Sequence, residues 1–229
     1  MPIPKSLGNS ASGLRKKDGN DIMNILVLAP HTDDGELGCG ASIAKFIAEG
    51  NKVYYATFSV CEESVPGGLP RDTLEREVVA ATAMLGILPE DLIIFRFPVR
   101  RFHESRQEIL NSMIDIREKI KPDLVFMPCK NDVHQDHSLL STEGIRAFKQ
   151  SSILTYEMVW NNLSMSTMAF IKVDKKHLDL KVEALKMYTS QQGIRQYMNR
   201  EFVESLARVR GVQAGSEFAE AFEVVRWII

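Results

Sequence analysis

The chain has 229 residues, of which 45% are hydrophobic, so it can bury one substantial core and suits a single globular domain better than two. Its 28 Lys and Arg residues against 30 Asp and Glu residues leave a formal charge of -2, which argues against nucleic acid or an anionic membrane as a partner and favours a small ligand. The three cysteines, Cys39, Cys61 and Cys129, form no C-x-x-C pair, a pattern that argues against a disulfide framework or a thiolate zinc site and favours the reducing cytoplasm.

The start of the chain is mostly polar and lacks the apolar stretch of a signal peptide. Nothing later approaches an apolar run of 18 residues, so we expect no membrane span. Residues 1–22 are predicted to form a polar arm that contacts a neighbouring subunit, which would make the protein a homo-oligomer. Residues 23–229 are expected to form one domain.

From residue 24 onward, short apolar runs alternate with apolar residues at helical spacing. The pattern predicts strands over 24–30, 52–60, 91–97 and 123–128, and helices over 37–50, 73–87 and 103–120. Repeated βα units with right-handed crossovers predict an α/β fold, a Rossmann-like three-layer αβα sandwich with a mostly parallel sheet. Beyond residue 150 the pattern is less regular, with strands predicted over 153–159, 168–173 and 221–229 and helices over 175–188 and 197–211.

Two clusters of polar residues follow predicted strands. Residues 29–40 read APHTDDGELGCG, and residues 131–138 read NDVHQDHS. Each cluster comes at the carboxyl end of a strand and at the start of a helix. In open α/β sheets the ligand crevice lies outside the carboxyl ends of the strands, where the strand order reverses. With the strand order 3-2-1-4-5, the two clusters face each other across that crevice.

The spacing within each cluster indicates metal binding. Residues i and i+3 point the same way on a helical turn, which pairs His31 with Asp34 and His134 with His137, so four potential ligands converge. Two histidines and an aspartate, with a fourth position left for water, are a usual set of ligands for a catalytic zinc. Asp33 is then free to act as a base toward that water, and the pattern predicts hydrolytic chemistry.

The stretches PHTDDGELGCG and NDVHQDH together resemble the signature of the PIG-L/LmbE-like family of zinc-dependent de-N-acetylases. The resemblance extends over most of residues 24–228. It implies a Zn²⁺ cofactor bound by His31, Asp34 and His137. It also implies that the substrate is a small N-acetylated amino sugar or glycoconjugate of the N-acetylglucosamine type, from which acetate is released.

The same resemblance assigns roles to the other polar residues of the two motifs. Asp33 is expected to be the catalytic base, and His134, taken as protonated, to stabilise the oxyanion. Asp136 is expected to orient His134. Thr32 stands where the family usually has Pro, and Glu36 stands one place later than the acidic residue that often follows the two aspartates; neither departure alters the expected ligands or their spacing.

Each feature also has a simpler interpretation. An isolated His-Asp pair after a strand is usually a helix cap, and only the second cluster in a matching position favours a site. The cysteines are best explained as small buried hydrophobic residues. A group of basic residues near the loops after the second and third strands fits surface charge better than a sugar pocket: Arg71, Arg100, Arg101, His103 and Arg106.

Two other functions fit parts of the pattern. A metal-dependent phosphohydrolase also uses His and Asp clusters, although the number of imidazoles favours zinc over Mg²⁺ or Mn²⁺. A non-catalytic sugar-binding protein of the same fold would be expected to lack the base or a ligand. Both Asp33 and the expected ligands are present, which favours the deacetylase.

Overall fold

The computed structural model describes residues 16–17 and 20–228, and its main feature is one mixed sheet. Seven strands among these residues pair in the order β5-β4-β3-β6-β7-β9-β8. Neighbours from β5 to β7 run parallel, while β9 runs antiparallel to both β7 and β8. The strands are β3 (Asn24–Ala29), β4 (Lys52–Thr57), β5 (Leu92–Ile94), β6 (Leu124–Pro128), β7 (Ser152–Tyr156), β8 (Ala169–Val173) and β9 (Phe218–Arg226).

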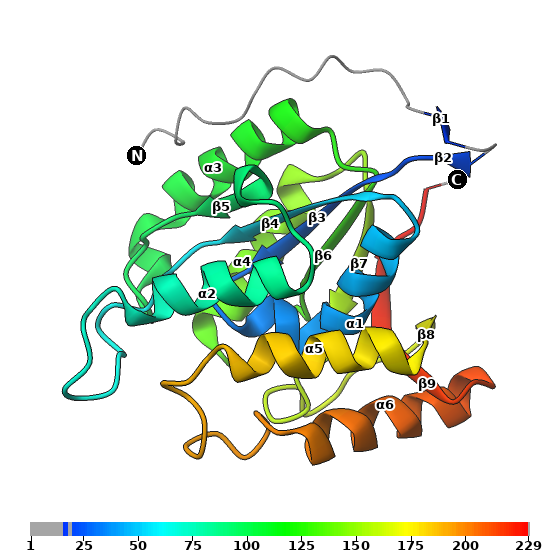
Figure 1. The fold of residues 1–229 in the computed structure, drawn as a ribbon. Coiled ribbons are helices and arrows are strands. Elements are labelled where there is room, and N and C mark those ends of the chain that lie inside the picture. Colours follow the sequence, from blue (N-terminus) through cyan, green and yellow to red (C-terminus); the bar gives the residue numbers. More distant parts are fainter. Residues whose placement is uncertain (1–15, 18–19, 229) are drawn as a thin grey trace.

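Helices cover both faces of the sheet (Figure 1). One face carries α1 (Asp34–Ala48), α2 (Thr73–Met84), α5 (Lys175–Lys186) and α6 (Arg200–Ala214), and the other carries α3 (Arg106–Ile120) and α4 (Gln135–Ala147). Short 3-10 turns, η1 (Pro89–Asp91) and η2 (Phe102–Ser105), precede β5 and α3. A separate antiparallel pair joins β1 (Lys16–Lys17) to β2 (Asn20–Asp21). The predicted three-layer α/β fold is confirmed.

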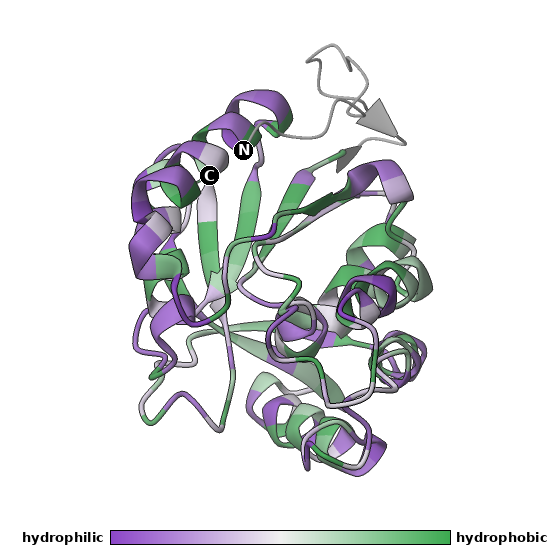
Figure 2. Ribbon diagram, turned by 90° about the vertical axis from the view of Figure 1, so that its left-hand side faces the viewer, coloured by the Kyte–Doolittle hydropathy of each residue, from purple (hydrophilic) through white to green (hydrophobic). Residues whose placement is uncertain are grey.

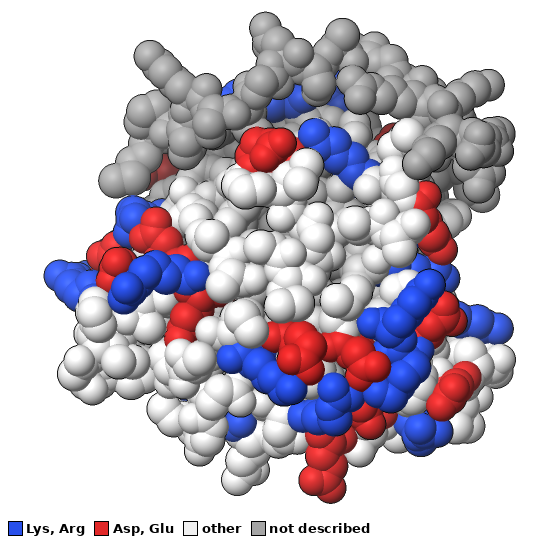
Figure 3. All heavy atoms as spheres, viewed as in Figure 1, with Lys and Arg blue, Asp and Glu red and all other residues white. Residues whose placement is uncertain are grey.

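The central strands are apolar throughout because both of their faces are covered. In β3, Ile25, Val27 and Ala29 pack into the cluster under α1, whereas Leu26 and Leu28 pack into the cluster under α3 and α4. Figure 2 shows the same arrangement as hydrophobic strands between helices whose outer sides are hydrophilic. On the face drawn in Figure 3, acidic and basic side chains are interspersed, as the near-neutral net charge leads one to expect.

Most predicted elements are found, with shifted ends. Helix α1 begins at Asp34, three residues before the predicted start. The acidic residues Asp34 and Glu36 stabilise its first turn by interacting with the helix dipole. The sequence pattern did not indicate this turn because Gly35 is a poor helix former. Strand β5 is shorter than predicted, but beyond its end the backbone N–H of Phe95 still donates to the carbonyl of Thr57, the last residue of β4, and that of Phe97 donates to the carbonyl of Phe58.

Helix α1 is broken at Cys39, whose backbone is not helical (φ -145°, ψ 24°). The Glu220 carboxylate accepts hydrogen bonds from the backbone N–H of Ala41 (3.2 Å) and of Ser42 (2.7 Å). The Lys181 ammonium donates to the carbonyl of Leu37 (2.7 Å) and to Glu220 (2.6 Å). A buried ion pair therefore satisfies the backbone groups that the break exposes, and this fixes the first turn of α1.

The predicted arm lies largely outside the described residues, so the arm, its boundary with the domain and the homo-oligomer stay predictions. The described helices include none that is long and apolar enough to cross a membrane. The three cysteines are free and buried, as expected from their spacing.

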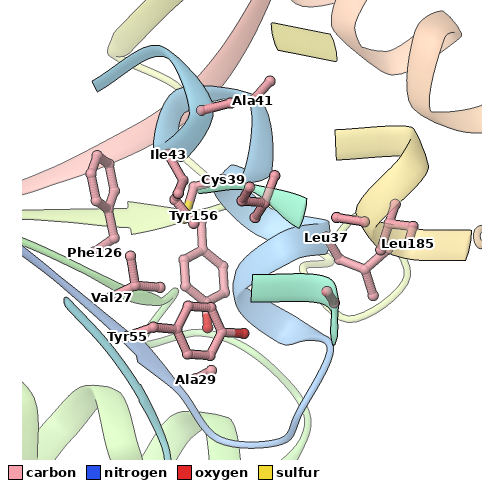
Figure 4. Close-up of a cluster of buried hydrophobic side chains, with 14 of the residues drawn as sticks. Val27, Ala29, Leu37, Cys39, Ala41, Ile43, Tyr55, Phe126, Tyr156 and Leu185 are labelled. Atoms are coloured by element: carbon pink, nitrogen blue, oxygen red, sulfur yellow. The ribbon is translucent and has the colours of Figure 1, made fainter. Parts of the chain in front are cut away.

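The contact between α1 and the sheet predicts the effect of one substitution. A Cβ added to Gly38 would overlap the ring of Tyr156, which lies fully buried beside α1 (Figure 4). We expect Gly38→Ala to lower the free energy of unfolding by about 1–3 kcal/mol, because the packed ring has no room to move. Urea denaturation measures this. Gly67→Ala, which adds a Cβ with no atom within 4 Å, is the control, and equal effects of the two substitutions would contradict the packing described.

Candidate metal centre

The two polar motifs meet because β3 and β6 are parallel neighbours. β3 leads through Pro30 and His31 into α1, and β6 leads through the second motif into α4. The sheet order reverses at this pair, so the chain leaves the two strands in opposite directions and opens a crevice at their carboxyl ends. The rings of His31 and His137 lie 5.0 Å apart, although 106 residues separate them in the sequence.

Three ligand atoms form a compact triangle. His31 Nδ1 lies 3.1 Å from Asp34 Oδ2 and 3.1 Å from His137 Nε2, and His137 Nε2 lies 3.2 Å from Asp34 Oδ2. Ligands around a tetrahedral zinc with bonds of 2.0–2.2 Å stand about 3.3 Å from one another. The triangle thus has the size of one face of a zinc coordination sphere.

Each of these histidines is held by a second carboxylate. Asp132 Oδ2 lies 2.8 Å from His137 Nδ1, and Asp136 Oδ2 lies 3.1 Å from His31 Nε2. With one ring N–H donated to the carboxylate in each pair, the other ring nitrogen points to the centre of the triangle, where a metal ion could replace its proton. Carboxylates in this position orient metal-binding histidines and raise their basicity.

Asp136 contacts His134 through its backbone N–H, whereas its side chain is directed to His31 instead of His134. Its carboxylate contacts His31 and accepts hydrogen bonds from the backbone N–H of Arg100 (2.5 Å) and Phe102 (3.3 Å). The difference arises because Asp136 lies in the first turn of α4, with its side chain directed across the crevice toward β3.

His134 is the N-cap of α4, and its Nδ1 accepts the backbone N–H of Asp136 at 3.2 Å. This bond leaves Nε2 free to carry a proton. One ring nitrogen of His134 lies within 4.8 Å of those of His31 and His137, and the three histidines form a group that could hold a metal ion. Burial, together with cationic His31 and His137, lowers the pKa of His134 to about 4, so its ring is neutral near pH 7 rather than protonated as expected.

The electrostatics of the triangle favour a positive charge. Burial alone would lower the pKa of His137, but the Asp34 and Asp132 carboxylates outweigh it and raise the pKa to about 10. The pKa of His31 is also raised, because Asp34 and Asp136 overcome the effect of burial. Asp34 itself is held well below its usual pKa by the two histidines, against the effect of burial. A bound cation would take the place of these protons.

Asp33 occupies the N-cap position of α1, but its side chain accepts no capping hydrogen bond. The interpretation of this residue as a simple helix cap therefore does not hold. Burial and the neighbouring Asp34 carboxylate raise the pKa of Asp33 to about 6. A carboxylate with a pKa just below neutral is ionised at pH 7 and is still basic enough to accept a proton from water.

A second group of buried side chains lies beneath the first motif. The hydroxyl of Tyr55 lies 2.5 Å from Glu36 Oε2 and 3.1 Å from the carbonyl of Thr32, and that of Tyr188 lies 2.9 Å from Glu36 Oε1 and 2.5 Å from the same carbonyl. Burial raises the pKa of Glu36 to about 8. A protonated Glu36 gives the group three hydrogens for its four contacts, whereas an ionised one would leave two.

The sequence-based reasoning gave no role to these supporting residues. Asp132 lies within the quoted second motif, and its distance of five residues from His137 is a usable signal. Glu36 lies within the first motif. Tyr188, in contrast, lies 152 residues from Glu36 in the sequence, and no local pattern connects them.

A polar cavity of ≈ 100 Å³ opens beside the triangle, between the segments that follow β4 and β5. Its lining includes Ser59, Cys61, Glu62, Arg71 and Arg96. Burial and the charges of Asp33, Asp34 and Asp136 raise the pKa of the Cys61 thiol. Because Cys61 lines the cavity, the cavity lies next to the crevice.

The basic residues that were considered for a sugar pocket have different positions in the structure. Arg71 lines the cavity. Arg106 pairs instead with the buried Glu143 (2.6 Å), and Arg101 pairs with the exposed Glu63 (2.7 Å).

Comparison with known proteins gives a consistent result. Residues 26–148 match the sequence profile of the PIG-L family, described as GlcNAc-PI de-N-acetylase. The chain is 28% identical over 177 residues to the uncharacterized deacetylase YaiS of Escherichia coli (strain K12), a match that covers 75% of this chain and 93% of YaiS.

Solved structures with low identity share the fold. The N,N'-diacetylchitobiose deacetylase of Pyrococcus horikoshii has a TM-score of 0.74 at 18% identity, covering 89% of this chain and 84% of that one. GalB, the 4-carboxy-2-hydroxymuconate hydratase of Pseudomonas putida KT2440, has a TM-score of 0.76 at 17% identity, covering 91% and 98%. The same fold therefore occurs in proteins named for different reactions.

The raised pKa of Glu36 predicts a pH-dependent contribution to stability. Between its unfolded pKa of 4.5 and its folded pKa of about 8, the folded chain retains a proton that the unfolded chain has lost, so stability falls as pH rises, by up to about 1.4 kcal/mol per pH unit. Glu36→Gln removes this titration and keeps the shape. Urea unfolding at pH 5 and pH 8 should show the variant gaining stability relative to the parent at the higher pH, and a pH-independent difference would contradict a protonated Glu36.

Proposed function

The chain belongs to the PIG-L family of metal-dependent deacetylases, and we propose that it uses zinc to remove the N-acetyl group from an N-acetylglucosamine-type sugar or sugar conjugate. The observation that carries the proposal is the triangle of His31 Nδ1, Asp34 Oδ2 and His137 Nε2 with the free Asp33 carboxylate beside it.

The donor set fits zinc. Two imidazoles and one carboxylate are ligands that zinc accepts, and the separations of 3.1–3.2 Å suit its bond lengths. Asp34 is preferred over His134 as the third ligand, because Asp34 Oδ2 lies 3.1 Å from His31 Nδ1 and 3.2 Å from His137 Nε2, close to the tetrahedral separation, whereas His134 Nδ1 already accepts the Asp136 N–H. Zinc bound here would lower the pKa of a coordinated water to ~7 and polarise the acetyl oxygen.

The chain's own residues then carry the protons. Asp33 accepts the proton of the attacking water, since its carboxylate is ionised near neutral pH and is not used as a cap. His134 donates its Nε2–H to the acetyl oxygen as negative charge develops there, acting as a neutral imidazole whose Nδ1 is occupied by the Asp136 N–H. Asp33 finally returns its proton to the departing amine, which leaves acetate and the free amino sugar.

The surroundings support a sugar as the substrate. The cavity beside the crevice is lined with hydroxyl, carboxylate and guanidinium groups, which can hydrogen-bond to sugar hydroxyls. The P. horikoshii protein that shares the fold is named for an N-acetylated disaccharide. Because the fold also occurs in GalB, the decisive assay is acetate released from a panel of N-acetylated sugars, with phosphate esters as the comparison.

The proposed ligand set predicts how two variants bind metal. Asp34→Ala should lose the metal, because it removes one corner of the triangle, whereas His134→Ala should retain one zinc per chain and lose turnover. Elemental analysis after dialysis measures the zinc content. The opposite pattern, with zinc lost only from His134→Ala, would mean that the three histidines are the ligands.

The role of Asp33 predicts both a rate and a pH profile. Asp33→Asn should keep the metal and lower kcat by ~10²–10⁴-fold, the usual effect of losing a general base. In the parent, kcat/KM should fall as pH drops through a pKa at or below about 6, since a nearby cation can only favour the ionised carboxylate.

The same variant supplies the control for the pH profile, because Asp33→Asn should lack this acidic limb. Parental rates in Asp33→Asn with full zinc content would show that Asp33 is not the base.

A further inference from the structure

Three loops meet beside the second motif and carry apolar side chains. Val133 directly precedes His134, and its backbone N–H donates to the carbonyl of Asn161 at 3.3 Å. Trp160, which directly precedes Asn161, stacks on Tyr197 with ring centroids 3.7 Å apart and planes 4° apart. The segments after β6, after β7 and after α5 are thus joined at the edge of the crevice.

The loop that carries Tyr197 faces the proposed base. The side chains of Tyr197 and Arg195 both lie close enough to the Asp33 carboxylate for their charges to interact. The start of this loop is tied to α2, where the Glu77 carboxylate accepts hydrogen bonds from Thr189 (2.9 Å) and from the backbone N–H of Ser190 (2.8 Å).

Three aliphatic side chains on these loops are exposed to solvent: Val133 at 62%, Leu163 at 86% and Ile194 at 59%. Single exposed aliphatic residues are ordinary, but here one comes from each of three loops around one site. We call Val133, Trp160, Leu163, Ile194 and Tyr197 the apolar rim.

The stacked rings of the rim, and the loop that carries Trp160, are held in place by contacts within the protein. Phe202 lies beside both stacked rings, at 6.0 Å from Trp160 and 6.4 Å from Tyr197. The loop after β7 is closed by the backbone N–H groups of Asn161 and Asn162, which both donate to the carbonyl of Met158 at 2.8 Å. A preformed apolar surface binds an apolar group with little cost of ordering.

We propose that the apolar rim binds an apolar aglycone, so that the preferred substrate is an N-acetylated amino sugar joined to an alkyl or aryl group rather than the free sugar. The inference rests on the proposed function, because it takes the crevice to hold the N-acetyl group. The occupant is the substrate's own aglycone because the rim is continuous with the second motif through Val133, and the part of a substrate beyond its sugar must leave the crevice past its edge.

The first experiment compares substrates with the zinc-loaded, full-length protein. N-acetylglucosamine, its 1-phosphate and octyl N-acetyl-β-D-glucosaminide differ only in the group at the anomeric position. We expect kcat/KM, measured as acetate release, to be roughly tenfold or more higher for the octyl glycoside, since burying one aliphatic side chain gives about that change in affinity. Equal values, or a preference for the phosphate bound through Arg195, would overturn the proposal.

Substitutions in the rim test whether its side chains cause the preference for the octyl glycoside. Leu163→Ser and Ile194→Ser should each lower kcat/KM for the octyl glycoside by several-fold to tenfold and leave that for N-acetylglucosamine unchanged, which also shows that the variants are folded. The control is Leu88→Ser, which changes an aliphatic residue outside the rim whose exposed fraction (54%) is close to that of Ile194 and which directly precedes the 3-10 turn before the edge strand β5. A preference that persists in both rim variants would overturn the proposal.

Binding without turnover separates this inference from the proposed function. Octyl β-D-glucoside has no amide to hydrolyse, and its binding can be followed by the fluorescence of Trp160 in a Trp227→Phe background. Binding that weakens in Leu163→Ser and Ile194→Ser supports the rim, even if no N-acetylated sugar releases acetate and the proposed function fails. Acetate release without any such binding would support the function and overturn the rim.

Discussion

The parallel pairing of β3 with β6 is the constraint on which the site depends. Ile25, Leu26 and Val27 pair with Leu124, Val125 and Phe126, and this register brings the ends of the two strands to the same edge of the sheet. Both strands are buried on both faces, so a shift in register would expose apolar side chains and is strongly disfavoured. The stability of the core therefore fixes the distance between the two motifs.

Burying several carboxylates at the carboxyl ends of β3 and β6 would be unfavourable without positive charge to balance them. Asp34, Asp132 and Asp136 are buried, and they surround two histidines whose pKa values are raised. A cation at the centre of this arrangement would balance the charge of these carboxylates. Glu36, two residues further along α1, lies outside that charge balance, and burial keeps it protonated although its hydrogen bonds with Tyr55 and Tyr188 lower its pKa.

The sequence was sufficient to predict the order of the first five strands of the parallel part of the sheet and the helices between them. It also predicted the residues that meet in the crevice. Apolar runs and i, i+3 spacing are local signals, which is why these features could be predicted. It was insufficient for the partner of Asp136, which depends on how the first turn of α4 faces β3. It also could not reveal Tyr188 beneath Thr32 or the stacking of Trp160 on Tyr197. These contacts join segments far apart in the chain, and only the packing of the layers brings them together.

The most direct test of this account is an anomalous-difference map from a crystal of the zinc-loaded protein. The account predicts one zinc peak about 2.0–2.2 Å from His31 Nδ1, Asp34 Oδ2 and His137 Nε2, with Asp33 and His134 outside the coordination sphere. A peak bound by His134 in place of Asp34, or no peak between the two motifs, would contradict it.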